Sequence, residues 1–90
     1  MDYQITHIIP DSADPDRRID AVYGPTCGLL YEDTAIRNID WGISSYYTMA
    51  YGLYRADVYA VTNAYGTRFL TTSPDGIGIN NLCQLPRYNG

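Results

Sequence analysis

The sequence contains no lysine, and its six basic residues are all arginine. Nine aspartates and Glu32 supply the acidic side chains, which leaves a net charge of −4. Duplex nucleic acid needs a positive protein footprint that releases counterions, so we expect no duplex nucleic-acid partner. Arginine also suits planar, bidentate recognition of phosphate or carboxylate, so a local pocket for a small anion stays open.

Cysteine and histidine are scarce. The chain has two cysteines, Cys27 and Cys83, and one histidine, His7. Their number and spacing predict neither a disulfide framework nor a metal site, and no cofactor motif is present. His7 reads as a strand residue, and Cys27 has no nucleophile motif around it. No paired acid–base or nucleophile arrangement is visible, so we expect no catalytic residues and a protein that is not an enzyme.

Long apolar runs are also missing, because no stretch approaches the ~20 residues that span a bilayer. The N-terminal segment MDYQITHIIPD lacks the basic and apolar regions of a leader peptide. We therefore expect a cytoplasmic protein with no membrane partner. The 90 residues predict a single domain over 1–90 with a thin core. Because disulfides and metals are not expected to reinforce that core, we expect a homo-oligomer.

Tyrosine is abundant, with ten residues in the chain, six of them between positions 46 and 65. Tyrosine suits half-buried strands, and its rigid ring with a polar tip also suits interfaces and ligand walls. A domain of this size cannot bury ten such rings, so some should face a partner, a ligand or solvent. The single tryptophan, Trp41, is expected in the core, which needs bulk.

Hydrophobic periodicity predicts five strands and one helix. Alternation places strands at residues 3–9, 18–23, 46–51, 57–64 and 68–72, and helical spacing predicts a helix over 33–43. The expected fold is α+β, with a five-stranded, mostly antiparallel sheet, one helix on one face and the order ββαβββ.

Local signals refine this prediction. Asp33 or Thr34 is suited to cap the helix, and Ile36, Ile39 and Ile43 form its apolar face. Gly66 supplies the positive φ that the turn before the last strand often needs. Residues 73–76, SPDG, have the composition of a type I turn, and Leu82 and Leu85 are spaced to pack into the core.

The C-terminal run RFLTTSPDGIGINNLCQLP, residues 68–86, carries a family resemblance. Its strand ending in aromatic-Leu-x-Thr, followed by Asp-Gly, Asn-Asn-Leu and Leu-Pro, resembles the C-terminal signature of DUF3892, a bacterial and phage domain of unknown function. The N-terminal strand and hairpin also fit that layout. The chain departs from the pattern at Cys83, where a leucine is frequent, and at Arg87-Tyr88, where many members end in Leu-Pro-x-Cys.

More loosely, the run is similar to a family of phage anti-Thoeris proteins, which are oligomeric sponges that sequester ADP-ribose-derived cyclic immune signals without cleaving them. This resemblance implies a small anionic nucleotide-like ligand in a pocket of arginine, an aromatic ring, hydroxyls and amides. The matching residues are Arg68, Phe69, Thr71, Thr72, Asp75 and Asn80.

The residues themselves permit two interpretations. Arg68 and Thr72 share one face of a strand and could bind a phosphate oxygen, with Tyr59 and Tyr65 near enough to offer a stacking ring. Alternatively, Arg68 pairs with Asp57 across the hairpin, Asp75 bonds within its own turn, and Asn80 caps the final turn. The first interpretation favours a non-enzymatic sponge for a cyclic nucleotide-type signal. The alternative function is an acidic, tyrosine-rich domain that docks on a host protein.

Overall fold

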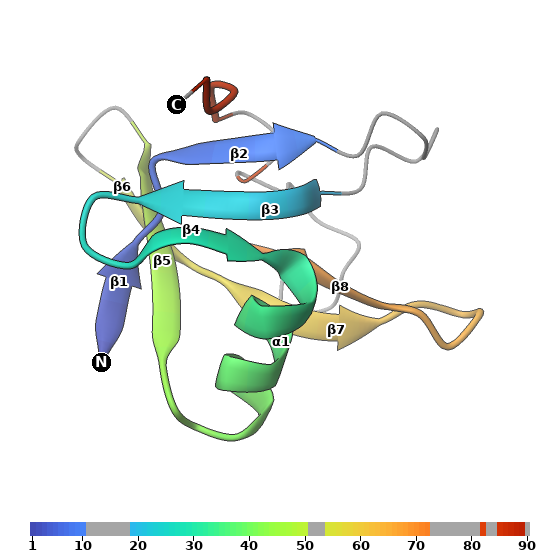
Figure 1. Ribbon diagram of the computed structural model, residues 1–90. Helices are drawn as coiled ribbons and strands as arrows, with labels where there is room; N and C mark the ends of the chain where they lie inside the picture. Colours follow the sequence, from blue (N-terminus) through green and yellow to red (C-terminus); the bar gives the residue numbers. More distant parts are fainter. Residues whose placement is uncertain (11–18, 51–53, 73–81, 83–84, 90) are drawn as a thin grey trace.

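The computed structural model describes residues 1–10, 19–50, 54–72, 82 and 85–89 (Figure 1). Its elements, in chain order, are β1 (Asp2–Gln4), β2 (His7–Pro10), β3 (Ile19–Gly24), β4 (Gly28–Tyr31), α1 (Glu32–Asp40), β5 (Ser45–Ala50), β6 (Tyr54–Asp57), β7 (Tyr59–Thr62) and β8 (Arg68–Thr71). None of the helices in this described part of the chain is both long and apolar enough to cross a membrane.

The strands are distributed over three small sheets among the described residues. Their orders are β1-β5-β6, β2-β3-β4 and β7-β8. β1 runs parallel to β5, and the other neighbouring strands are antiparallel. The prediction of a small α+β fold with mostly antiparallel strands is confirmed, but the prediction of one five-stranded sheet is wrong.

The sheets are separate because the chain changes sheet in the middle of two predicted strands. The predicted strand 3–9 divides where the Ile5 N–H donates to the Tyr47 carbonyl at 2.8 Å and the Thr6 N–H donates to the Tyr23 carbonyl at 2.8 Å. The predicted strand 57–64 divides at Val58, whose N–H donates to the Tyr46 carbonyl at 2.9 Å. At Val58 the side-chain alternation continues through the crossing, whereas in the first segment the buried side changes from Ile5 to Ile8, three positions later.

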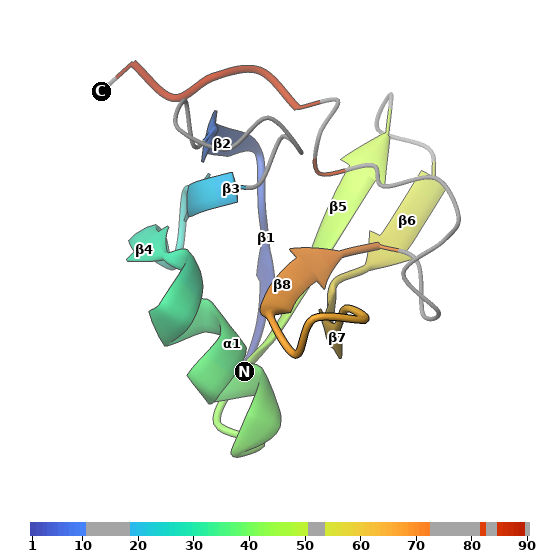
Figure 2. The ribbon, with the colours of Figure 1, turned by 90° about the vertical axis from the view of Figure 1, so that its right-hand side faces the viewer.

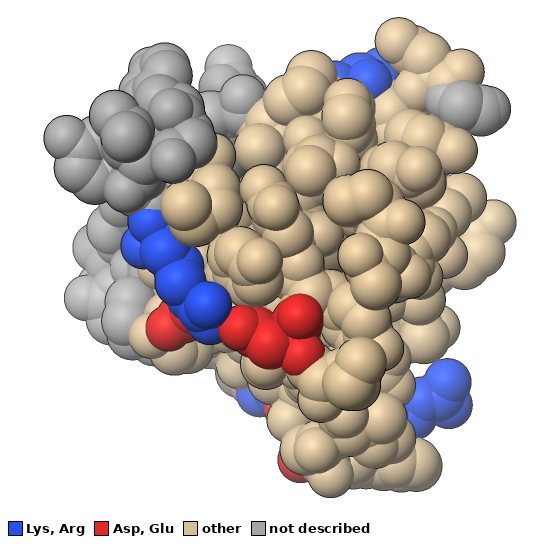
Figure 3. All heavy atoms as spheres, turned by 90° about the vertical axis from the view of Figure 1, so that its left-hand side faces the viewer, with Lys and Arg blue, Asp and Glu red and all other residues tan. Residues whose placement is uncertain are grey.

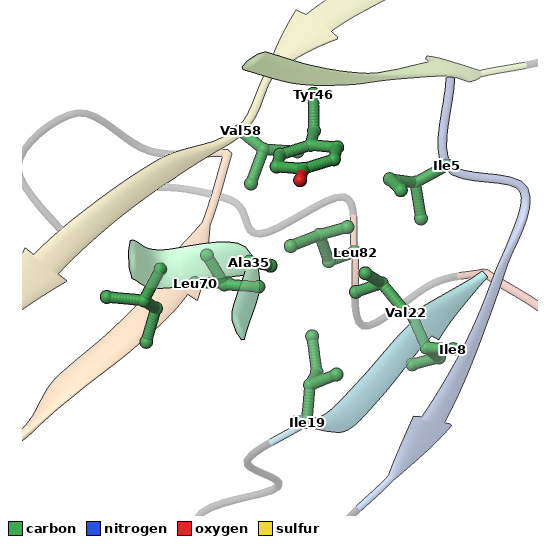
Figure 4. Close-up of a cluster of buried hydrophobic side chains, with 10 residues drawn as sticks. Ile5, Ile8, Ile19, Val22, Ala35, Tyr46, Val58, Leu70 and Leu82 are labelled. Carbon is green, nitrogen blue, oxygen red and sulfur yellow. The ribbon is translucent and has the colours of Figure 1, made fainter. Parts of the chain in front are cut away.

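The core lies where the three sheets and the helix meet (Figure 4). Leu82 is fully buried at its centre, as predicted, and Leu85 packs against it half-buried. Ile5, next to one sheet crossing, and Val58, at the other, are both core residues. The crossings therefore place apolar side chains inside the molecule, and they bring elements distant in sequence into contact with one cluster.

Helix α1 is shorter than predicted and begins earlier. Its N-cap is Tyr31, in extended backbone and with no side-chain cap hydrogen bond, so the predicted cap at Asp33 or Thr34 is wrong. Ile36 is buried and Ile39 half-buried, which confirms that part of the apolar face. The helix ends before Gly42, whose φ is 69°, so Ile43 lies beyond it.

The β7–β8 hairpin has the turn that Gly66 predicts, with a φ of 81° at that residue. The Asn63 side-chain oxygen accepts the N–H groups of Tyr65 at 2.8 Å and Thr67 at 3.0 Å. The turn predicted at 73–76 and the predicted cap at Asn80 lie outside the described residues.

Candidate functional site: the surface at the C-terminal end of α1

Trp41 projects from the end of α1 with 71% of its surface exposed, so the prediction that it lies in the core is wrong. The reason is helical geometry. At about 100° per residue, Trp41 lies roughly 140° round the axis from Ile36 and roughly 200° from Ile39, far from the buried face. Arg37, one turn earlier, lies on the same side, and its guanidinium carbon is 5.8 Å from the centre of the indole ring.

Next to Trp41 in the chain, Asp40 joins the end of α1 to the β7–β8 hairpin. Arg68 of β8 donates to Asp40, the last residue of α1, and also donates to the Thr62 hydroxyl of β7 at 3.2 Å. Figure 2 shows β8 and the end of β7 beside the helix. We call this region the α1 C-terminal surface. It consists of Arg37, Asp40, Trp41, Ile43, Thr62 and Arg68.

The ion pair at this surface differs from the one predicted. Arg68 pairs with Asp40 and not with Asp57, which instead accepts from Arg55 Nε at 3.0 Å. The side chains of Arg68 and Asp40 are 39% and 41% exposed, so solvent screens the pair and its contribution to stability is small. The Arg68 charge is nevertheless already matched by a carboxylate.

The other predicted ligand residues are spread over both faces of the hairpin. Thr71 is buried opposite Tyr59, on the face of β7–β8 that Arg68 does not share. Tyr65 is 93% exposed at the hairpin tip. Phe69 and Thr72 are half-buried, and Asp75 and Asn80 lie outside the described residues. The structure therefore joins Arg68 to Thr62 and Asp40, and the ligand site itself stays a prediction.

A second charged cluster lies on the sheet β1-β5-β6. Asp2 accepts from the Ser45 hydroxyl at 2.8 Å and from Arg55 at 2.7 Å, and the Arg55 guanidinium carbon lies 4.2 Å from the centre of the Tyr47 ring. Figure 3 shows blue and red side chains in contact, beside described side chains that are mostly tan and therefore uncharged. The hydrogen bond from Ser45, followed by that from Arg55, lowers the pKa of Asp2. Because Arg55 also donates to Asp57, the cluster holds one guanidinium between two carboxylates.

The two side chains with the chemistry of a general base or a nucleophile, His7 and Cys27, pack within the fold. His7 Nδ1 is 2.8 Å from the Thr6 hydroxyl, and its ring packs edge-on against Tyr23 and Tyr88. Burial raises the pKa of the Cys27 thiol, which reduces its thiolate character. Within the described ranges, no three His, Cys, Asp or Glu side chains lie close enough to hold a metal ion.

Sequence reasoning did not predict that Trp41 is exposed, although the helical period places it far from Ile36 and Ile39 on the helix surface. It also missed Asp40 as the partner of Arg68, because 28 positions separate them and no local pattern connects them.

Comparison with known proteins gives a family without an assigned activity. A model of the family described as "Protein of unknown function (DUF3892)" matches residues 4–86. No curated protein and no solved structure matches the chain. The looser resemblance to phage anti-Thoeris proteins therefore stays a prediction.

Proposed function

Since the chain belongs to the DUF3892 family of proteins of unknown function, we propose its role from its surface: it is a non-enzymatic protein-interaction domain that docks on a partner protein through the α1 C-terminal surface. The observation that carries this proposal is Trp41, a large aromatic side chain with 71% of its surface exposed on a regular helix end. Tryptophan and arginine are the residues most enriched among the energetically dominant contacts of protein interfaces.

The surroundings of Trp41 support an interface. Ile43, two residues further along the chain, is 53% exposed, and Arg37 packs over the indole ring. Asp40, the residue before Trp41, and its partner Arg68 add one charge of each sign. An apolar centre with a polar rim is the usual composition of a protein–protein contact. A partner that covers Trp41 would also strengthen the neighbouring ion pair by excluding water.

The shape of this surface favours a macromolecular partner over a small one. Small-molecule sites are concave and bury most of the ligand, whereas Trp41 projects outward and Arg68 is already paired with Asp40. A protein can surround a projecting ring, and a small ligand cannot.

Trp41 is the single tryptophan of the chain, so its fluorescence reports directly on this surface. We expect an affinity-tagged chain to recover a partner from bacterial lysate, the Trp41→Ser variant to lose that partner, and the matched Tyr65→Ser variant to retain it. Addition of the purified partner should shift the tryptophan emission to the blue. Recovery of the same partner by Trp41→Ser would contradict the proposal.

A second candidate function is a sponge for a small anionic nucleotide-like ligand, possessed by a phage or prophage and acting as a homo-oligomer on an ADP-ribose-derived signal. One observation favours it: the Arg68 guanidinium and the Thr62 hydroxyl are hydrogen-bonded to each other with both side chains accessible to solvent. A phosphate would take the place of the Asp40 carboxylate.

Titration calorimetry against cyclic ADP-ribose isomers and cyclic oligonucleotides tests the second candidate. Asp40→Asn, which releases Arg68, should bind more tightly than the natural chain, and Arg68→Ala should not bind. Absence of binding heat in all of these titrations excludes the sponge and leaves the protein-interaction proposal standing.

A further inference from the structure

The segment after Leu85 lies along the free edge of β2, at the end of the molecule opposite the end of α1 (Figures 1 and 2). The Ile8 N–H donates to the Pro86 carbonyl at 3.1 Å, and the Tyr88 N–H donates to the Ile8 carbonyl at 2.8 Å. Ile8 and Arg87 thus form an isolated parallel bridge. The segment therefore pairs with the outer edge of the sheet β2-β3-β4 at one position, with the hydrogen bonding of a parallel strand.

The Tyr88 ring is held in an aromatic cradle made by Tyr23 and His7. It stacks on Tyr23 with ring centres 4.1 Å apart and planes 16° from parallel. His7 stands edge-on to Tyr88 at 6.2 Å and to Tyr23 at 5.9 Å. Stacked and edge-to-face arrangements are the favoured geometries of aromatic pairs.

The cradle is built from regular secondary structure and does not depend on Tyr88 for its position. His7 and Tyr23 are directly opposite each other in the β2–β3 ladder, so the backbone fixes their separation. The Thr6 hydroxyl, 2.8 Å from His7 Nδ1, holds the imidazole orientation. By contrast, Pro86, Arg87 and Asn89 are exposed, and Tyr88 is only half-buried.

We propose that the β2 edge and the Tyr23–His7 cradle form a binding site for an extended peptide segment of a partner protein that presents an aromatic side chain, and that the chain's own Tyr88 occupies this site until the partner displaces it. The Ile8 N–H and carbonyl supply main-chain pairing, as when a peptide adds a strand to a sheet edge, and the cradle selects the ring. The main-chain pairing specifies a peptide and not a nucleobase, because a base has no backbone to pair with Ile8.

The test uses the full chain with Tyr88→Ala, which vacates the cradle, and the peptide acetyl-Leu-Pro-Arg-Tyr-Asn-amide as the probe. His7 is the single histidine, so its imidazole proton signals are unambiguous in NMR spectra. We expect the peptide to shift these signals upfield and saturably in Tyr88→Ala. The natural chain should bind at least tenfold more weakly, because its own segment competes and only the open fraction binds.

Three controls make the outcome decisive. The same peptide with alanine in place of tyrosine should not bind, and Tyr23→Ala added to Tyr88→Ala should abolish binding, whereas Trp41→Ser should leave it unchanged. Tyr88→Leu, which keeps apolar bulk, replaces Tyr88→Ala if the latter does not fold. The proposal would be overturned if the tyrosine and alanine peptides bound equally well, or if the natural chain bound the peptide as tightly as Tyr88→Ala does. It would also be overturned if Tyr88→Ala bound no peptide, or if it bound adenosine in place of the peptide. Because Trp41 is outside this site, failure here does not affect the proposed docking surface.

Discussion

At the scale of single residues, Gly24 is the most crowded of the glycines that the structure describes. A β-carbon built on it would lie 2.0 Å from the Gln4 carbonyl oxygen and 3.0 Å from the Cys27 sulfur. The first contact is with backbone at the end of β1, which cannot move without disturbing the crossing from β1 to β2. We expect Gly24→Ala to lower the free energy of unfolding by about 1–3 kcal/mol, as overpacking does, measured by urea denaturation.

The matched control is Gly66→Asn. Gly66 has a φ of 81° and open space around its α-carbon, and asparagine tolerates that conformation. This variant should remain close to the natural stability. An unchanged urea midpoint for Gly24→Ala would show that the strand ends can separate at no cost.

At the scale of elements, α1 begins without a side-chain cap although its backbone is suited to one. Tyr31 has the extended conformation of an N-cap, with φ −66° and ψ 151°, but its side chain makes no cap hydrogen bond. Tyr31→Ser would supply a side-chain oxygen at the N-cap that can accept from the N–H groups of Asp33 or Thr34. We expect a gain of about 0.5–1 kcal/mol, seen as a rise of a few degrees in the melting temperature, and no gain for Tyr31→Ala.

The sheet β1-β5-β6 is connected by a charge-assisted contact that should depend on pH. Asp2 of β1 accepts from Ser45 of β5 and Arg55 of β6, and these bonds lower its pKa. The folded chain therefore keeps Asp2 ionised to lower pH than the unfolded chain, whose value is about 3.9. The contribution is present above the unfolded pKa and is lost as pH falls through the folded one.

Urea midpoints measured from pH 7 down to pH 2.5 check this expectation. The natural chain should lose more stability on acidification than Asp2→Asn, and Ser45→Ala should lie between them. The difference should be small, because Asp2 and Arg55 are substantially exposed. Identical pH profiles for the natural chain and Asp2→Asn would show that the contact does not contribute.

The same elements show what sequence could and could not predict. Local signals were sufficient for the Gly66 turn and for the Ile36–Ile39 face, because each depends on a few neighbouring residues. The division into three sheets could not be predicted, because the partners of each strand depend on tertiary packing and a crossing residue such as Val58 continues the alternation of the strands around it. At the candidate site, Arg68 was predicted from the chemistry of arginine. Its pairing with Asp40 could not be predicted, because tertiary packing brings the two residues together. Trp41 was predicted to lie in the core because of its size, although its position on the helix places it away from the buried face.

At the scale of the whole molecule, the chain is compact on its own. Its radius of gyration of 12.0 Å equals the value of about 12 Å for a folded chain of this length. A domain this small has a small core even when it is compact. Trp41 and Ile43 lie outside that core and are exposed. A second copy could cover such side chains, which is the physical reason to expect self-association.

We expect light scattering at micromolar concentration to give twice the mass of one chain, with a radius of gyration of about 16 Å by small-angle X-ray scattering. Tyr65→Ser, which alters an exposed ring at the hairpin tip, should behave as the natural chain does. Dissociation of Trp41→Ser into monomers would place self-association and partner docking on the same surface, so that a partner protein would compete with the second copy. A monomer mass for the natural chain at all concentrations would contradict the oligomer, and the exposed Trp41 would then be available to another protein without competition.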